Sequence, residues 1–206
     1  MPVIDLSLKI SEKMPVYSDD PKPKIRQLHT IKSRGFDEKE LTILTHHSTH
    51  MDAHSHKFEG GKNLDEEPVE KFFNDALKID LIGVKKISAK DLEPFEKEIA
   101  SVKALVLHTG YGKRILDGSA GMDFPFLEKD AGEFLSKFSL NILGIDSMSL
   151  DAPTTGAVHK ILLPKGVIFL EAMVNLEKAP KRFKLIALPL FVEESDGAPC
   201  RAVAEF

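Results

Sequence analysis

The chain has 206 residues, of which 42% are hydrophobic and 29% charged, and its formal net charge is -4. This mixture is typical of a globular protein and excludes a disordered or fibrous chain. Acidic and basic residues are interspersed without a basic stripe, so nucleic-acid binding is not indicated, and no run approaches the ~20 apolar residues that span a bilayer.

Length, cysteine content and the N-terminus indicate the organisation of the chain. No linker or repeat divides the sequence, so we expect a single domain covering residues 1–206. The first ten residues are too acidic and too poor in apolar residues for a signal peptide. Cys200 is the only cysteine and cannot form an internal disulfide, which suits a reducing compartment. We therefore expect a cytoplasmic protein in which Cys200 is a small buried residue.

Apolar runs rich in β-branched residues predict a series of strands. They cover residues 41–46, 77–83, 101–109, 141–147, 166–173 and 183–192. Helical spacing of apolar residues predicts helices between several of them, and these cover residues 67–76, 88–99 and 125–138. The alternation predicts an α/β fold, and the extended segments of the N-terminal half predict a mixed sheet.

The segment HHSTHMDAHSH, from His46 to His56, holds five of the eight histidines and one aspartate. On a strand, alternate side chains share a face, and this face would carry His46, Ser48, His50, Asp52, His54 and His56. A straight strand would separate its two ends by roughly 30 Å, so one shared site requires bends near Ser48 and after Asp52. Imidazoles and a carboxylate suit zinc, manganese or ferrous iron, and the absence of cysteine ligands argues against a closed structural zinc site.

The same segment resembles the signature H-x-G-T-H-x-D-x-P-x-H of the metal-dependent cyclase family, which includes bacterial kynurenine formamidases and isatin hydrolases. The match runs through His46, Thr49, His50, Asp52 and His56. Five further segments are similar to family segments, so that the resemblance covers nearly the whole chain: EGGKNLDEEPVEKF, VLHTGY, LGIDSMSLD, HKILLPKGVIFLEAMVNL and IALPLFVEESDGAPCRAVA. The resemblance implies a mixed, barrel-like sheet with flanking helices and a strand pair at the C-terminus.

The resemblance also implies the roles of individual residues. His46, His50 and Asp52 would bind one metal ion, and Asp52 would bridge to a second ion held by His159 and Glu171. His56 would be the general base or proton shuttle. The resemblance implies one or two divalent ions per chain, Zn²⁺ first and Mn²⁺ or Fe²⁺ as alternatives, a small-molecule substrate, and a homodimer or homotetramer.

Two positions depart from the family signature. Ser48 replaces its glycine, which restricts the backbone at the expected bend, and His54 replaces its proline. His54 could be an extra metal ligand, a hydrogen-bonding partner of Asp52 or a substrate contact, and of these we expect the hydrogen bond to Asp52. We expect His47 to pack or hydrogen-bond behind the strand. Residues 14–23 resemble the family's N-terminal loop over the site, with Tyr17 near its centre.

These residues predict a hydrolase that cleaves a small amide, formamide or lactam bond with water activated by the metal. Two alternatives remain open at this point. His50, Asp52 and His159 also fit the two-histidine, one-carboxylate triad of non-haem iron oxygenases. A non-catalytic metal-binding module would use a histidine-rich tract without a fixed pocket.

Overall fold

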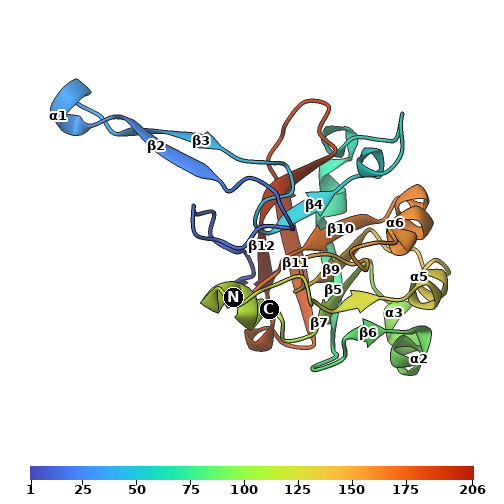
Figure 1. Ribbon diagram of the computed structural model, residues 1–206. Helices are drawn as coiled ribbons and strands as arrows, with labels where there is room; N and C mark the ends of the chain where they lie inside the picture. Colours follow the sequence, from blue (N-terminus) through green and yellow to red (C-terminus); the bar gives the residue numbers. More distant parts are fainter.

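The computed structural model describes residues 1–206, and its centre is a sheet that curls back on itself (Figure 1). A further pairing between β12 and β4 closes the sheet into a barrel and leaves β1 attached to β12. In spatial order the strands are β1 (Val3–Asp5), β12 (Gly197–Glu205), β11 (Arg182–Pro189), β5 (Phe73–Asp80), β7 (Ala104–His108), β9 (Ile142–Ile145), β10 (Ile168–Glu171) and β4 (His50–Asp52).

Strand direction divides the barrel into two parts. Strands β5, β7, β9 and β10 are mutually parallel, whereas β4, β11 and β12 pair antiparallel with their neighbours. The mixed, barrel-like sheet that the sequence predicts is therefore confirmed, and so is the C-terminal strand pair.

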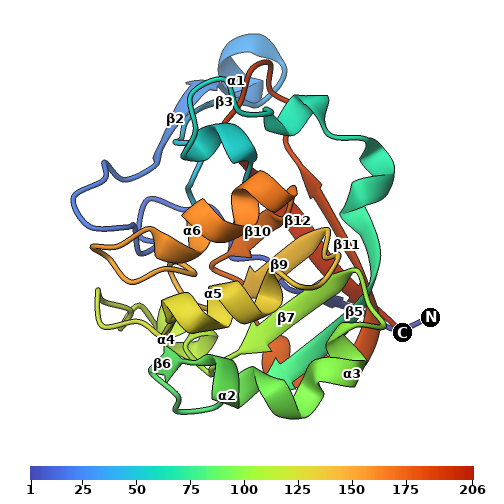
Figure 2. The same cartoon turned by 90° about the vertical axis from the view of Figure 1, so that its right-hand side faces the viewer.

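Helices cover the outer face of the parallel part (Figure 2). Parallel neighbours need crossover connections, and short helices lie in these connections. They are α2 (Ala89–Leu92), α3 (Glu96–Ile99), α4 (Gly112–Asp117), α5 (Lys129–Leu135) and α6 (Ala157–Leu162). Two short strands outside the barrel, β6 (Lys86–Ile87) and β8 (Phe126–Leu127), pair with each other. No helix in the structure is long and apolar enough to cross a membrane.

The strands carry two hydrophobic cores because alternate residues face opposite sides of the sheet. On β7, Leu105 and Leu107 face the helices, whereas Ala104 and Val106 face the barrel interior. Small residues make up much of the interior cluster, which lets the barrel close tightly: Ala76, Ala104, Ala187, Ala198, Ala202 and Ala204. A sheet that is buried on both faces explains the nearly continuous apolar runs in the sequence.

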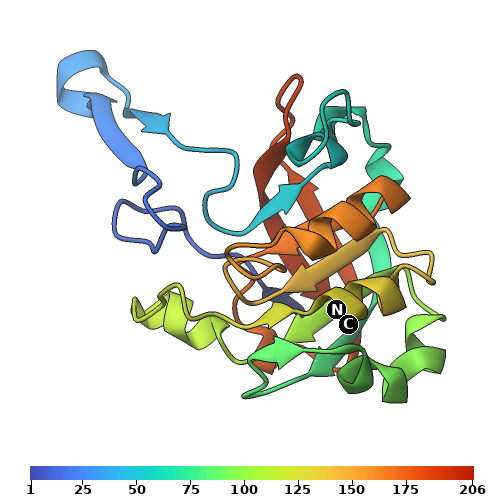
Figure 3. The same cartoon turned by 45° about the vertical axis from the view of Figure 1, so that its right-hand side comes forward.

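A β-hairpin arm extends away from the barrel (Figures 1 and 3). It consists of β2 (Lys24–His29), α1 (Ile31–Arg34) and β3 (Glu38–Thr42). The two strands pair with each other, and no residue between positions 24 and 42 is buried. The predicted strand at residues 41–46 is wrong for most of its length, because β3 ends at Thr42.

The predicted helix at residues 67–76 is also wrong. A 3₁₀ turn occupies Val69–Phe72, and β5 begins directly afterwards at Phe73. Phe73 pairs with Ile186 of β11, so sheet pairing overrides the helical spacing of the apolar residues.

The helix predicted at residues 88–99 is confirmed as α2, a 3₁₀ turn (Glu93–Phe95) and α3, with a capping box between Ser88 and Asp91.

The helix predicted at residues 125–138 is shorter in the structure, where α5 covers Lys129–Leu135. The preceding Phe126–Leu127 forms β8 instead. The remaining 3₁₀ turns cover His54–His56, Leu64–Glu66, Leu163–Lys165 and Leu176–Lys178.

Candidate metal centre

The histidine-rich segment bends twice rather than running as one strand. Only His50–Asp52 forms a strand, β4, and His54–His56 forms a 3₁₀ turn. The first bend is at Ser48, whose φ of 66° lies in the left-handed region that glycine occupies most easily. Both predicted bends are therefore confirmed, and Ser48 adopts the backbone conformation for which the family signature has glycine.

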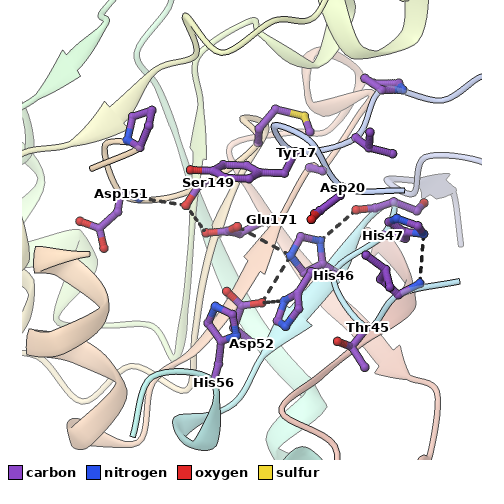
Figure 4. A pocket seen from close by; sticks show the side chains of 18 of the residues that line it. Tyr17, Asp20, Thr45, His46, His47, Asp52, His56, Ser149, Asp151 and Glu171 are labelled. Carbon is purple, nitrogen blue, oxygen red and sulfur yellow. Dashed lines mark hydrogen bonds and ion pairs between the residues drawn. The ribbon is translucent and has the colours of Figure 1, made fainter. Parts of the chain in front are cut away.

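The segment lines a cavity of about 400 Å³. Figure 4 shows the side chains of His46, Asp52, His56 and Glu171 turned toward one another in this cavity. His50 and His159 also line it, so all six residues that the family resemblance singles out gather in one place. They come from β4 and its flanking turns, from α6 and from the end of β10.

Asp52 lies at the centre of the cluster and is almost completely buried. Its Oδ1 is 2.8 Å from Nδ1 of His46 and 3.3 Å from Nε2 of His50. Its Oδ2 is 3.3 Å from Nε2 of His159. Burial opposes ionisation of Asp52, but hydrogen bonds from these three imidazoles outweigh it and hold the pKa of Asp52 well below its usual range.

His50 and Glu171 face each other across the pair of strands β4 and β10. Nδ1 of His50 is 3.0 Å from the carbonyl oxygen of Ser48, so this nitrogen carries a proton and donates it. Nε2 therefore points toward the carboxylates, 3.7 Å from Oε2 of Glu171. The backbone N–H of Leu150 donates to Oε1 of Glu171 at 2.7 Å. Burial and the neighbouring Asp52 carboxylate raise the pKa of Glu171.

His159 is oriented by a second aspartate. Its Nδ1 lies 2.5 Å from Oδ2 of Asp151, and this carboxylate also accepts from the backbone N–H groups of Val158 and His159. Nε2 of His159 is thereby directed at Asp52 and Glu171. Burial lowers the pKa of His159, but hydrogen bonds to Asp151 and Asp52 overcome this effect and raise it to about 9.

His46 and His56 lie side by side, with ring centroids 4.1 Å apart. Burial lowers the pKa of His56 despite the nearby Asp52 carboxylate. For His46 burial acts in the same direction, but hydrogen bonds to Asp52 and Asp196 raise the pKa to about 9.

Position 197, beside His46, has room only for glycine, because a Cβ there would lie 2.6 Å from the carbonyl oxygen of Met51 and 2.7 Å from Cε1 of His46.

The expected hydrogen bond from His54 to Asp52 is not formed. His54 begins the 3₁₀ turn and packs on Phe58, with ring centroids 4.9 Å apart. Residues two apart in a 3₁₀ turn point in different directions, so His54 and His56 cannot share a face as they would on a strand. His47 is buried, as expected, and its Nδ1 accepts a hydrogen bond from the backbone N–H of Leu44.

The N-terminal loop forms another wall of the cavity, as its resemblance predicts. Met14, Pro15, Val16, Tyr17 and Asp20 line the cavity, and Figure 4 shows Tyr17 and Asp20 on this side. Cys200 has no place in this site, and burial raises the pKa of its thiol, which disfavours a nucleophilic thiolate.

The side chains present fit a divalent cation. Two sets of possible ligands have donor atoms within 4.8 Å of one another, and Asp52 belongs to both: His46, Asp52 and His56, and His50, Asp52 and Glu171. Metal-binding histidines usually donate their second N–H to a carbonyl or carboxylate. His50 and His159 do so, to Ser48 and Asp151 respectively. Buried carboxylates in such proximity also need a compensating positive charge.

Two residues of the site were not singled out by the sequence. Asp151 ends the LGIDSMSLD segment, and Asp196 precedes Gly197 in the C-terminal segment. Both carboxylates contact histidines of the cavity. Asp196 and Gly197 lie close to the histidines only because β12 pairs with β4. No local pattern in the amino-acid sequence predicts that pairing.

Comparison with known proteins places this geometry in a family. The sequence model of a family described as "Putative cyclase" matches residues 4–152. A kynurenine formamidase of Bacillus thuringiensis (strain Al Hakam) is 34% identical over 167 residues, which cover 80% of this chain and 78% of the relative.

Two solved structures have the same fold. A potential metal-dependent hydrolase with cyclase activity is 25% identical, with a TM-score of 0.85 over 98% of this chain and 96% of the other. Isatin hydrolase A from Ralstonia solanacearum is 20% identical and superimposes with a TM-score of 0.87 over 98% and 91% of the two chains, a likeness of fold. The family match and the formamidase relative together show that the chain belongs to the cyclase family, as the histidine signature predicts.

Proposed function

We propose that the chain is a metal-dependent hydrolase that cleaves a small amide, formamide or lactam bond. One observation carries the proposal: the buried Asp52 carboxylate meets three imidazoles at 2.8 to 3.3 Å, at the wall of a cavity of about 400 Å³. The kynurenine formamidase and isatin hydrolase relatives support the reaction class, since their names describe cleavage of a formamide and hydrolysis of isatin.

We assign His46, His50 and Asp52 to one cation and Asp52, His159 and Glu171 to a second. Mixed imidazole and carboxylate ligands suit Zn²⁺ best, with Mn²⁺ or Fe²⁺ as alternatives. A divalent cation in such a site supplies Lewis acidity, which lowers the pKa of water and polarises a carbonyl group. A single ion bound through Asp52 is the alternative to two ions, because Asp52 belongs to both groups of possible ligands.

His56 is the general base of the proposal. Its lowered pKa keeps the imidazole neutral near pH 7, so it can accept a proton. Nδ1 faces Asp196 at 3.1 Å, whereas Nε2 has no protein partner and is available to water or substrate. His56 would take a proton from the attacking water and return it to the departing nitrogen.

The two alternative functions lack comparable support. The barrel of mixed strands with helices on one face differs from the all-β barrel expected of the oxygenase class. A storage module would not need His159 and Glu171, which come from distant parts of the chain and meet the histidine segment in a shaped cavity. The storage alternative would treat this convergence as accidental.

We further propose that the chain is one domain that works in the cytoplasm as a homodimer or homotetramer, of which the dimer is the simpler. The β-hairpin arm supports the dimer, because an isolated two-stranded hairpin is only marginally stable in water. The arm has four exposed large apolar side chains, Leu28, Ile31, Phe36 and Leu41. A second copy of the chain would cover these side chains and hold the arm.

An assay of the metal-replete protein tests the proposed reaction. The substrates are N-formylkynurenine, isatin and simple aryl formamides, and the matched variant is Asp52→Ala. Hydrolysis of at least one substrate by the wild type, with loss of turnover in the variant, is the expected result. No hydrolysis of any of them, with stoichiometric metal bound, would contradict the proposed substrate class.

A further inference from the structure

Asp196 contacts two histidines that line the cavity, His46 and His56, with a single oxygen atom. Its Oδ2 is 2.7 Å from Nε2 of His46 and 3.1 Å from Nδ1 of His56. Both contacts are within hydrogen-bonding distance. The Asp196 side chain is 41% exposed to solvent, and an ionised carboxylate only accepts hydrogen bonds. Both nitrogens that face Oδ2 therefore carry protons.

We infer that Asp196 is a positioning residue that sets the tautomers of His46 and His56. Metal binding would displace the proton that Nδ1 of His46 shares with Asp52. With the remaining protons on Nε2 of His46 and Nδ1 of His56, each ring then has one nitrogen left for chemistry. In His46 this is Nδ1, which faces Asp52 at 2.8 Å and is the atom placed to bind the cation. In His56 it is Nε2, the atom that accepts the proton. The inference rests on the proposed function, since it assigns the ligand atom and the base atom of that site.

The backbone around Asp196 is held in place by the same strands that carry the site. The backbone N–H of Ala53 donates to the carbonyl oxygen of Asp196 at 2.9 Å, and Gly197 pairs with Asp52 in the register of β12 and β4. Gly197 has no room for a side chain beside His46. The carboxylate of Asp196 is thus fixed relative to Asp52, His46 and His56 by neighbouring backbone. This rigidity is what a residue needs if it is to hold two rings in one orientation.

A surface ion pair is the simpler explanation of the same contacts. In that case Asp196 would only compensate the charge of His46, and its removal would leave the tautomer of His56 unchanged. The positioning role instead requires that the ring of His56 responds to the same substitution. Nitrogen-15 NMR of the histidine side chains separates the two explanations, because the shifts of Nδ1 and Nε2 identify which nitrogen carries the proton.

The test uses the zinc-loaded protein labelled at histidine, as wild type, Asp196→Asn and Asp196→Ala. In the wild type we expect His46 protonated only at Nε2 and His56 only at Nδ1. In Asp196→Ala we expect His56 to lose its single tautomer, kcat to fall about 10- to 100-fold and KM to stay nearly constant, as for other residues that orient metal-site histidines. Asp196→Asn keeps one acceptor oxygen, so its kcat and its His56 tautomer population should lie between those of the wild type and of Asp196→Ala. Asp75→Asn, on an exposed position of β5, is the matched control and should behave as wild type.

Several results would overturn the inference. A wild-type protein with His46 protonated at Nδ1 or His56 at Nε2 contradicts it directly, even if both Asp196 variants fail to fold. Unchanged tautomers in a folded Asp196→Ala also contradict it. If the tautomers respond as expected but no amide or lactam is hydrolysed, the positioning role stands and the proposed reaction fails. The two claims can therefore fail separately.

Discussion

His50 of β4 and Glu171 of β10 are register partners in an antiparallel pair, and His50 Nε2 lies 3.7 Å from Glu171 Oε2. Closure of the barrel creates this relationship, because β10 also pairs with β9 and thereby joins the parallel strands to the histidine segment. The candidate metal centre is thus built where the parallel and antiparallel parts of the sheet meet.

Removal of the charge on Asp151 should weaken metal binding without unfolding the protein. In Asp151→Asn the side chain of His159 loses its charged partner, so Nε2 is no longer held toward Asp52 and Glu171. We expect the affinity for Zn²⁺ to fall about 10- to 100-fold. Competition with a chromophoric chelator measures this change. An unchanged affinity, with the wild-type circular dichroism spectrum, would show that His159 does not bind metal.

Substitution of His56 should separate metal binding from proton transfer. His56→Gln removes the titratable nitrogen but preserves a polar side chain of similar reach. We expect kcat to fall about 10²- to 10⁴-fold, the usual contribution of a general base, while the metal content stays stoichiometric. Steady-state kinetics with elemental analysis of the same samples tests this expectation. Loss of metal in the variant would identify His56 as a ligand, as its proximity to His46 and Asp52 allows.

The left-handed conformation of Ser48 should make glycine the best tolerated substitution. Ser48→Gly loses the hydrogen bond from Oγ to the carbonyl oxygen of Leu8, worth about 1 kcal/mol, but relieves a similar amount of backbone strain. We expect a free energy of unfolding within about 1 kcal/mol of wild type. Ser48→Val loses the hydrogen bond and places a β-branched side chain at positive φ. Its free energy of unfolding should therefore be lower than that of the wild type by more than about 2 kcal/mol. Denaturant titration of both variants compares them, and equal losses would argue against strain at Ser48.

Asp80 should stabilise the protein in a pH-dependent way, away from the metal centre. Its Oδ1 is 2.6 Å from Nδ1 of His108 and 3.2 Å from Nζ of Lys78. Burial raises the pKa of Asp80, but these two partners outweigh burial and lower it. A folded pKa below the unfolded value means that the stabilisation is present above the unfolded pKa of about 3.9 and is lost as pH falls through the folded pKa.

We therefore expect Asp80→Asn to be less stable than wild type by about 1 kcal/mol at pH 7, a small value because the carboxylate is largely exposed. The difference should narrow as the pH falls below about 4. Urea unfolding of both proteins across this range measures it, and comparison of the two cancels the titration of the metal site. A difference that stays constant with pH would show that the charge of Asp80 is not responsible.

The exposed arm should be required for dimer formation. Ile31→Asp combined with Phe36→Asp places two charges among the apolar side chains at the arm's tip, where the wild-type residues are 68% and 52% exposed. We expect the mass in sedimentation equilibrium to drop from two chains to one. Val69→Asp replaces an apolar residue that is equally exposed outside the arm and should leave the mass unchanged. A dimer that persists in the double variant would exclude the arm as its interface.

The sequence was most informative where side-chain chemistry and local spacing act together. The bends at Ser48 and after Asp52 followed from the distance that one site can span, and the structure confirms both. Several strands were also predicted, because both faces of the sheet are buried and their apolar runs are nearly continuous.

The failures occur where distant parts of the chain decide the outcome. Residues 67–76 have helical spacing, yet pairing with β11 begins β5 at Phe73, so the last four residues of that segment are in a strand. Strand alternation placed His54 beside Asp52, whereas the 3₁₀ turn moves it to Phe58. Asp196 reaches His46 and His56 only because β12 closes the barrel against β4, a contact that no local pattern reports.

Metal dependence is the central claim, and one titration tests it most directly. The protein is purified without a histidine tag, stripped with a chelator and reloaded with Zn²⁺ or Mn²⁺, while bound metal and hydrolysis of N-formylkynurenine, isatin and an aryl formamide are measured on the same samples. We expect one or two ions per chain, turnover of at least one substrate in proportion to bound metal, and neither in Asp52→Ala. No stoichiometric binding of either metal, or turnover that persists in the stripped protein, would contradict the proposed function.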